Sequence, residues 1–215
     1  MTSPLIVFDL DGTLSDSQQA IVSTFQAVAP ALRADDITPM IGLSLDKMFA
    51  RLVPGGDVPA LVAGYRAAYL EHDARHTKLF PGIASMLFAL QGRGLRLAVA
   101  TSKRQRGAEA SVGRLGITGH FDLIVGDAPE RRGKPHPDML EHVLRTLGAD
   151  PQDAIMVGDT TFDLQMARAA GVYAIGVSWG MHGAARLAPF GPVASDATGL
   201  HGLISRQLWI SRQQS

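Results

Sequence analysis

The segment from Leu5 to Thr13 constrains the fold of this chain most, because it reads as a buried strand that ends in two acids and a glycine. Four apolar residues precede Asp9, Leu10, Asp11 and Gly12. Side chains alternate along a strand with a period of two, so Asp9 and Asp11 lie on the same side of an extended backbone. Two like charges ~4 Å apart at an effective dielectric constant of ~20 repel by about 4 kcal/mol. A metal ion or a shared proton relieves such repulsion, so the segment predicts a ligand site at the end of a strand.

Three later segments carry polar residues next to apolar stretches and at positions suited to starting a helix. Their polar residues are Thr101 and Ser102, then Lys134, and finally Asp159 and Asp163. The carboxyl ends of parallel strands meet at one edge of an open α/β sheet, where such folds bind ligands. We therefore expect an α/β fold with a doubly wound, mostly parallel, Rossmann-like sheet that brings these residues to Asp9 and Asp11.

With these motifs the chain resembles the haloacid dehalogenase-like phosphohydrolases, in the branch that looks like phosphoglycolate phosphatase. The resemblance rests on Asp9–Thr13, Thr101–Ser102, Lys134 within Lys-Pro-His-Pro, and Gly158–Asp163. It covers most of the chain and is specific for the superfamily, but it does not identify the substrate. It implies a Mg²⁺-dependent enzyme that hydrolyses the phosphomonoester of a small phosphorylated metabolite.

The resemblance also implies which carboxylates do the chemistry. Asp9 would attack phosphorus and form an aspartyl-phosphate, which is a known use of an aspartate nucleophile. Asp11 would protonate the leaving group and later activate water as a general acid and base. Asp9, Asp159 and the main-chain carbonyl of Asp11 would hold Mg²⁺, an ion that prefers such oxygen ligands. Asp163 would support the site by fixing a bound water or Lys134.

The phosphate oxygens would be bound by a second group of residues. The resemblance implies that the hydroxyl of Thr101 and the ammonium of Lys134 contact them directly. Main-chain amides near Leu10, Asp11 and Ser102 would add further donors. Such donors stabilise charge as it shifts onto the transferred group in the transition state.

From Ser15 to about Phe80 the apolar spacing changes from strand type to helical type. A structureless loop of about 65 residues would be implausibly long, so we expect a small helical domain over residues 15–80. Residues 1–14 and 81–215 would then form the catalytic core. The resemblance implies that the helical domain is a cap that closes over the active site. Lys47, Arg51 and Arg66 are candidates for binding an anionic part of the substrate, with a solvated helix face as the alternative.

After the cap, the pattern predicts an alternation of helices and strands that ends in a helix. The helices are expected over 82–92, 105–115, 137–147, 162–170 and 199–209, and the strands over 95–100, 122–126, 154–158, 173–177 and near 192–194.

Composition limits the possible partners of the chain. It has no cysteine, which excludes disulfides, thiolate zinc sites and a cysteine nucleophile. Twenty basic and twenty acidic residues cancel without a long run of one sign, so neither nucleic acid nor an anionic membrane is an expected partner. The first apolar run is too short for a signal peptide or a membrane span. We expect a soluble cytoplasmic protein whose oligomeric state the sequence leaves open.

Several alternatives remain open at this stage. Gly176–Gly180 fits the G-x-S-x-G pattern of serine hydrolases with Ser178 as nucleophile, and Asp196 and His201 follow in the order of a triad. Against that reading, Asp196 and His201 are close together and little chain follows Ser178. His72 and His76 lie one helical turn apart, which suits zinc, but no third ligand is evident.

Within the superfamily, a phosphosugar mutase or a pyrophosphatase would share every core motif. A non-catalytic module that binds a phosphorylated metabolite is the alternative from another class. It would not need to keep both Asp9 and Asp11.

Overall fold

The apolar run at the start of the chain forms β1 (Leu5–Phe8), an inner strand of a six-stranded sheet. The structure is a computed structural model, and it describes residues 3–213. The other strands of this sheet are β4 (Arg96–Arg104), β5 (Leu123–Asp127), β6 (Ala154–Gly158), β7 (Tyr173–Val177) and β8 (Val193–Ala194). Their spatial order is β5-β4-β1-β6-β7-β8, and each neighbouring pair is parallel.

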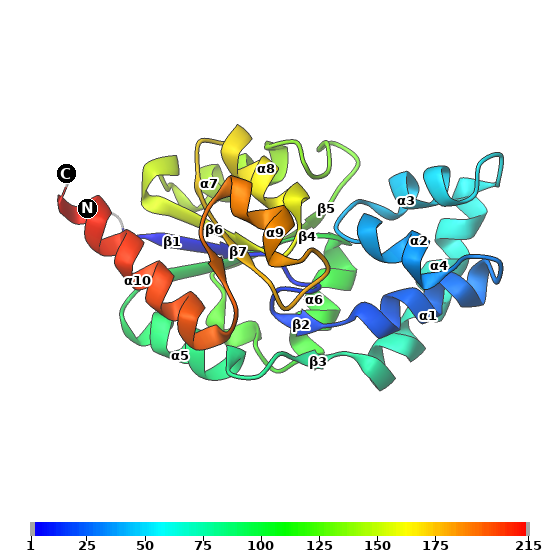
Figure 1. Cartoon of the computed structure of the whole chain (residues 1–215), viewed down its shortest axis with the longest axis horizontal. Helices are drawn as coiled ribbons and strands as arrows, with labels where there is room; N and C mark the ends of the chain where they lie inside the picture. The colour runs from blue at the N-terminus through cyan, green and yellow to red at the C-terminus, as the bar shows by residue number, and fades with distance from the viewer. Residues whose placement is uncertain (1–2, 214–215) are drawn as a thin grey trace.

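Alternate residues of β1 face opposite sides of the sheet, and each side has its own apolar cluster. Ile6 and Phe8 pack on the side covered by α5 (Ile83–Gly92), α6 (Gln105–Arg114) and α10 (Ala197–Gln213). Leu5 and Val7 pack on the side covered by α7 (Asp138–Leu147), α8 (Thr161–Ala169) and α9 (Ala184–Leu187). Figure 1 shows α7 and α8 above the sheet and α5 and α10 below it. Helices on both faces require strands that are apolar on both faces, so the expected doubly wound core is confirmed.

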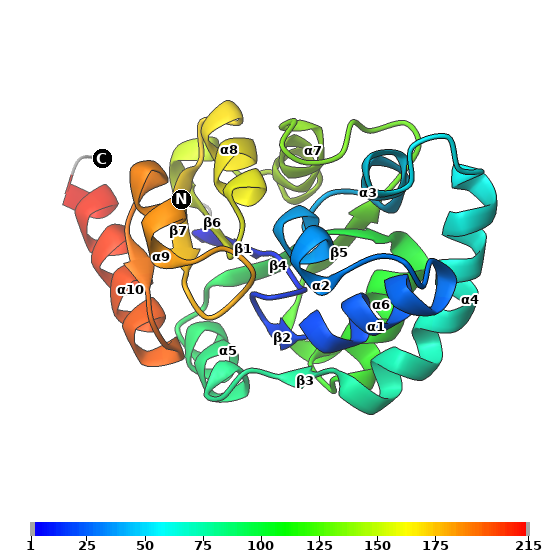
Figure 2. The same ribbon diagram turned by 45° about the vertical axis from the view of Figure 1, so that its right-hand side comes forward.

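Four helices form a separate group beyond the carboxyl ends of the strands (Figures 1 and 2). They are α1 (Gln18–Val28), α2 (Ala34–Ile37), α3 (Leu45–Leu52) and α4 (Val58–His76). The rings of Phe25, Phe49 and Tyr65 meet in their centre, with centroids 4.7 to 6.2 Å apart. β2 (Ser15–Asp16) and β3 (Lys78–Leu79) pair antiparallel where the chain enters and leaves this group. We call residues 15–80 the cap.

The structure departs from the expected elements at a few points. β4 continues to Arg104 instead of ending near residue 100, because Arg104 pairs with Asp127 of β5 after an irregularity in the register. The last helix begins at Ala197 and extends to Gln213, beyond the predicted 199–209. The β2–β3 pair, the four-residue helices α2 and α9, and four short 3₁₀ helices were not predicted, since they are too short to show a periodic pattern. The 3₁₀ helices are Thr38–Met40, Thr118–His120, Pro151–Asp153 and Ala188–Phe190.

None of the helices in the described part of the chain has the length and apolar character needed to cross a membrane.

Candidate active site

The carboxyl ends of β1, β4 and β6 meet beneath the cap, and this edge of the sheet collects the predicted site residues. Asp9 directly follows β1, Thr101 lies in the last part of β4, and Asp159 directly follows β6. Lys134 comes from the loop before α7, and Asp163 lies in the first turn of α8. Asp9, Thr101, Lys134, Asp159 and Asp163 are all buried. Segments far apart in the sequence therefore supply one compact group of charged side chains.

Lys134 connects two of the buried acids. Its Nζ donates hydrogen bonds to Oδ1 of Asp9 at 2.5 Å and to Oδ1 of Asp163 at 2.6 Å. Burial opposes the charge on this lysine, but the two carboxylates hold its pKa above the usual value, so it stays protonated. The other oxygen of Asp163 accepts hydrogen bonds from the amide and the hydroxyl of Thr160. Thr160 and Asp163 together form a capping box at the start of α8. Asp163 thus fixes Lys134 against a helix end.

Asp159 is held by contacts that the sequence analysis did not foresee. Its Oδ1 accepts from the hydroxyl of Thr13 at 2.9 Å, and its Oδ2 accepts from the amide of Met181 at 2.7 Å. Two glycines make room for this carboxylate. A Cβ at Gly12 or at Gly180 would lie 2.2 or 2.3 Å from Oδ2 of Asp159. Gly12 also has a φ of +89°, a conformation that other residues rarely adopt.

The three acids fit a hard divalent cation. Asp9, Asp159 and Asp163 each offer an oxygen, and these atoms lie within 4.8 Å of one another. Burial raises the pKa of Asp9 to about 7, even though Lys134 opposes the shift. Burial and the neighbouring carboxylates raise the pKa of Asp159 well above its usual value. A bound cation favours the ionised forms of Asp9 and Asp159, and carboxylate oxygens are the ligands that Mg²⁺ prefers.

Asp163 is the least suited of the three to bind the ion directly. Its Oδ2 already accepts two hydrogen bonds from Thr160, and its Oδ1 is bonded to the Lys134 ammonium. The oxygens of Asp159 each accept a single hydrogen bond, which leaves lone pairs free. Asp9 keeps one oxygen without a hydrogen bond to any residue of the described range 3–213. Asp9 and Asp159 are therefore the better ligands.

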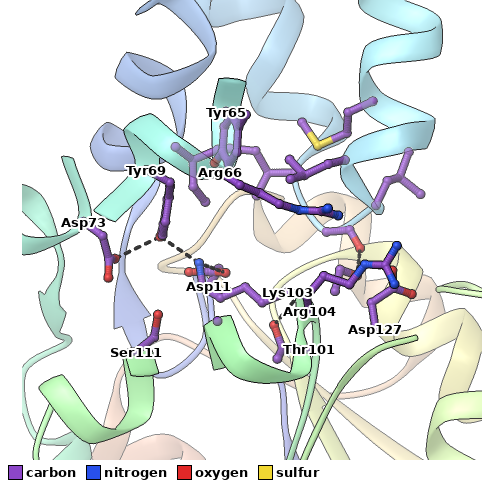
Figure 3. Close-up of a pocket in the computed structure, with 18 of the residues that line it drawn as sticks. Asp11, Tyr65, Arg66, Tyr69, Asp73, Thr101, Lys103, Arg104, Ser111 and Asp127 are labelled. Carbon is purple, nitrogen blue, oxygen red and sulfur yellow. Dashed lines mark hydrogen bonds and ion pairs between the residues drawn. The ribbon is translucent and has the colours of Figure 1, made fainter. Parts of the chain in front are cut away.

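Asp11 is paired with Lys103, a residue that the sequence analysis gave no role (Figure 3). The Lys103 Nζ lies 2.8 Å from Oδ2 of Asp11 and donates to the Tyr69 hydroxyl of the cap at 2.7 Å. Tyr69 in turn donates to Asp73 at 2.9 Å, and Asp73 is paired with Arg114 of α6 at 2.6 Å. Oδ1 of Asp11 is buried and has no hydrogen-bond partner among the described residues. Lys103 thus holds one Asp11 oxygen and leaves the other unpaired.

The remaining phosphate-site candidates lie as follows. Thr101 is buried against the cavity under the cap, and its hydroxyl accepts from the Lys103 amide at 3.3 Å. The Leu10 side chain belongs to the apolar core, so only its main chain can reach the site. The hydroxyl of Ser102 donates to the carbonyl of Gly42 in the cap at 2.7 Å, which leaves the amide of Ser102 for the predicted role.

The three cations proposed in the cap have different surroundings. Lys47 donates to the carbonyls of Gly133 and Lys134 at 3.2 and 3.3 Å, so it joins the cap to the lysine loop and does not point to a substrate. Arg51 is exposed and does not line the cavity. Arg66 does line it. Periodicity places these residues on helix faces, but it does not show which face meets the core.

Two alternative sites gain no support from the geometry. The Ser178 hydroxyl donates to the carbonyl of Ala194 at 3.2 Å, and Asp196 accepts from the amide of Gly199 at 2.8 Å. A Ser178–His201–Asp196 triad does not form among the described residues. Within that same range, the acids around Asp9 form the sole group suited to a metal, so His72 and His76 do not make a zinc site.

The chain is similar to proteins of known family. The family model for haloacid dehalogenase-like hydrolases matches residues 6–177. A Dickeya dadantii protein named "Probable phosphatase IndB" is 42% identical over 83% of this chain and 83% of its own length. A Chromobacterium violaceum phosphoglycolate phosphatase is 35% identical over 85% of this chain and 88% of its own. The solved structure of a haloacid dehalogenase-like hydrolase from Streptococcus pneumoniae has a TM-score of 0.85 and 30% identity, covering 94% of this chain and 98% of its own.

Proposed function

The chain belongs to the haloacid dehalogenase-like hydrolase family, as a phosphatase, and we propose that it hydrolyses a small phosphomonoester with Mg²⁺ through an aspartyl-phosphate on Asp9. The observation that carries this proposal is the buried group of Asp9, Lys134, Asp159 and Asp163 at one edge of the sheet. Asp11 lies beside it, on the wall of the cavity under the cap. We further propose that the substrate is a soluble cytoplasmic metabolite, since the charge balance favours neither nucleic acid nor a membrane.

In the first step, a carboxylate oxygen of Asp9 forms a bond to phosphorus while the bond from phosphorus to the leaving alcohol breaks. Lys134 donates a hydrogen bond to one oxygen of this carboxylate and so holds Asp9 in place. Asp11 gives its proton to the leaving oxygen. Lys134 and Thr101 bind the phosphate oxygens as charge shifts onto them.

In the second step, Asp11 takes a proton from water, and the water oxygen attacks phosphorus. The bond from phosphorus to Asp9 breaks, and inorganic phosphate leaves. General acid and base help of this kind is worth about 10² to 10⁴ in rate. Asp11 must therefore be held in position through both steps, which the Lys103 ion pair supports.

Asp9, Asp159 and the main-chain carbonyl of Asp11 would hold Mg²⁺, with Asp163 fixing Lys134 next to them. When bound, the ion neutralises the repulsion between the Asp9 carboxylate and the phosphate dianion. Oxygen donors and raised carboxylate pKa values support this assignment.

The metal site predicts a pH-dependent effect of Mg²⁺ on stability. Without the ion, folded Asp9 keeps its proton up to about pH 7, whereas the unfolded chain releases it near 3.8. The free energy of unfolding should therefore fall as pH rises between these values, by up to about 1.4 kcal/mol per pH unit for this group. Mg²⁺ binds the ionised carboxylate. The increase in the Tm of the protein on adding Mg²⁺ should therefore be larger at pH 8 than at pH 5.

Thermal unfolding at both pH values, with and without Mg²⁺, measures this difference. Asp159→Asn is the matched variant, because it removes one proposed ligand, and it should show little Mg²⁺-dependent shift at either pH. An equal shift at pH 5 and pH 8 in the unsubstituted protein would be evidence against the site.

Lys103 gives a second prediction, through its contact with Asp11. In Lys103→Met the acid loses the partner that holds it, so kcat/KM for an alkyl phosphate should fall by about 10²-fold, the lower end of general acid catalysis. An aryl phosphate has a leaving group that needs little protonation, and its kcat/KM should fall much less. Steady-state kinetics with the two substrates measures the ratio.

Lys78→Met is the control for this comparison, since Lys78 is exposed and lies outside the site. A similar loss with both substrates in Lys103→Met would mean that Lys103 binds the phosphate and does not position the acid.

The test of the proposed function is a panel of phosphorylated metabolites assayed for phosphate release with and without Mg²⁺. Release that requires Mg²⁺ and survives Ser178→Ala supports the proposal. Transfer of phosphate between positions of a sugar, or release only from pyrophosphate, would favour the mutase or the pyrophosphatase. Binding without turnover of any compound, a generic aryl phosphate included, would favour a non-catalytic module.

A further inference from the structure

The cavity between cap and core is far larger than its phosphate-binding end. It has a volume of about 530 Å³, and Asp9, Asp11 and Thr101 lie at its core side. Charged side chains of β4 and α6, among them Arg104, Arg106 and Arg114, form one part of its wall. Apolar and aromatic side chains of the cap form the part across from the site. They include Leu43, Leu45, Met48, Tyr65, Tyr69 and Leu70. Figure 3 shows Tyr65 and Tyr69 on the cap side, across from Asp11 and Thr101.

The size and the chemistry of this wall do not suit a short polar acid. Pockets of roughly 300 to 1,000 Å³ enclose ligands of drug size, and binding is most favourable when the ligand covers their apolar walls. A two-carbon phosphate would occupy the core side and leave the cap wall in contact with water. The rings of Tyr65 and Tyr69 stack on each other, with centroids 5.5 Å apart and an angle of 18° between the planes, and form one part of this apolar wall.

Leu70 gives an independent indication. The described residues include four large apolar side chains that are strongly exposed, namely Leu70, Phe88, Tyr173 and Trp209. Of these, only Leu70 lines the cavity, and it is 67% exposed. An apolar ligand that reaches the mouth of the cavity would cover Leu70 and remove this surface from water.

We propose that the substrate is a phosphomonoester whose alcohol carries an apolar ring system, and that Leu70 and the neighbouring cap wall select for it. This inference rests on the proposed function, since the phosphate group must reach Asp9. The phosphate end is bound at the edge of the sheet, and the ring system occupies the space between α4 and α6.

The test compares 2-phosphoglycolate, benzyl phosphate and 2-naphthylmethyl phosphate in steady-state kinetics with Mg²⁺. The free energy gained by burying one aromatic group should make kcat/KM about tenfold or more higher for 2-naphthylmethyl phosphate than for 2-phosphoglycolate. The ratio of kcat/KM for the naphthylmethyl ester to that for phosphoglycolate should fall in Leu70→Ser. It should also fall in Ala110→Phe, because Ala110 is an exposed residue of α6 that lines the cavity and a larger side chain there takes up its space.

Phe88→Ser is the matched control. Phe88 is 71% exposed on α5 and does not line the cavity, so its substitution removes an equally exposed apolar side chain without changing the ratio. Neither Leu70 nor Ala110 is part of an apolar core, so both variants should fold. A kcat/KM for phosphoglycolate equal to or above that for the ring compounds would overturn the proposal, and so would a ratio that neither substitution changes.

A binding measurement separates this proposal from the proposed function. If no compound releases phosphate in the presence of Mg²⁺, the proposed function fails. Calorimetry with 2-naphthylmethylphosphonate and phosphonoacetate then still tests the cavity. Tighter binding of the naphthyl compound that weakens in Leu70→Ser supports the apolar site, and equal or weaker binding contradicts it.

Discussion

Replacing Asp9 with asparagine should reduce Mg²⁺-dependent phosphatase turnover by a factor on the order of 10⁴ or more, as removal of a catalytic nucleophile does in other enzymes. A carboxamide is a poor nucleophile and a poor ligand for Mg²⁺, so both proposed roles of Asp9 are lost together. The loss should appear in kcat with every substrate, aryl phosphates included, because the missing bond to phosphorus precedes departure of any leaving group.

Asp9→Asn is also expected to fold, which makes its kinetics interpretable. The substitution removes a buried carboxylate whose charged form is disfavoured by burial, and Lys134 keeps Asp163 as its partner. Asp36→Asn is the control, because Asp36 is an exposed acid in α2. Circular dichroism and thermal unfolding should show a native fold in both variants. Near-normal turnover of purified Asp9→Asn would rule out Asp9 as the nucleophile.

Replacing Lys134 with methionine should damage stability and activity at the same time. The ammonium is fully buried between Asp9 and Asp163, and removing one member of a buried charge group typically costs about 3 to 5 kcal/mol. The same charge is proposed to bind the phosphate in the transition state, so kcat should fall by about 10²- to 10³-fold or more. Urea denaturation gives the stability, and steady-state kinetics with an aryl phosphate gives the activity.

The stability loss in Lys134→Met should depend on pH. As pH falls, Asp9 takes up a proton and no longer needs a counter-charge, so the difference from the unsubstituted protein should shrink. Lys47→Met is the matched control, because Lys47 donates hydrogen bonds to main-chain carbonyls of the loop that carries Lys134 and is partly exposed. Unchanged stability in Lys134→Met, or a loss no larger than in Lys47→Met, would contradict a buried charge group.

The core of the site could be predicted from the sequence because of the way parallel sheets are built. Asp9 and Asp159 each follow an apolar strand, and parallel strands end at the same edge of the sheet. Once both strands are identified, the proximity of their acids follows without any knowledge of side-chain contacts. Lys134 was predicted from its motif, and its place between Asp9 and Asp163 is a contact that only the structure shows.

The contacts between cap and core could not be predicted in the same way. Tyr69 and Lys103 are 34 positions apart, and Gly42 and Ser102 are 60 apart. Helical periodicity shows that Tyr69 shares a face with other apolar residues, but it does not show which residue of the core that face meets. Lys103 was visible as the residue after Thr101 and Ser102, yet a lysine at the end of a strand is most often a solvated charge.

The three cations of the cap also show that helical periodicity does not predict contacts between cap and core. Lys47, Arg51 and Arg66 are equivalent by sequence, since each lies on a predicted helix. The structure separates them by their contacts: Lys47 holds the loop of Lys134, Arg51 is exposed, and Arg66 lines the cavity. The contacts of each residue depend on how the cap docks on the core. No local sequence pattern encodes that docking.

The central claim is that Asp9 accepts the phosphoryl group, and trapping the phosphorylated enzyme tests it most directly. Asp11→Asn with Mg²⁺ and an aryl phosphate should accumulate the intermediate, because the good leaving group needs no acid while the second step still needs the missing base. Acid quenching, borohydride reduction and peptide mass spectrometry should then find homoserine at position 9. Phosphate release without any such product at Asp9, or a modification at another residue, would contradict the account.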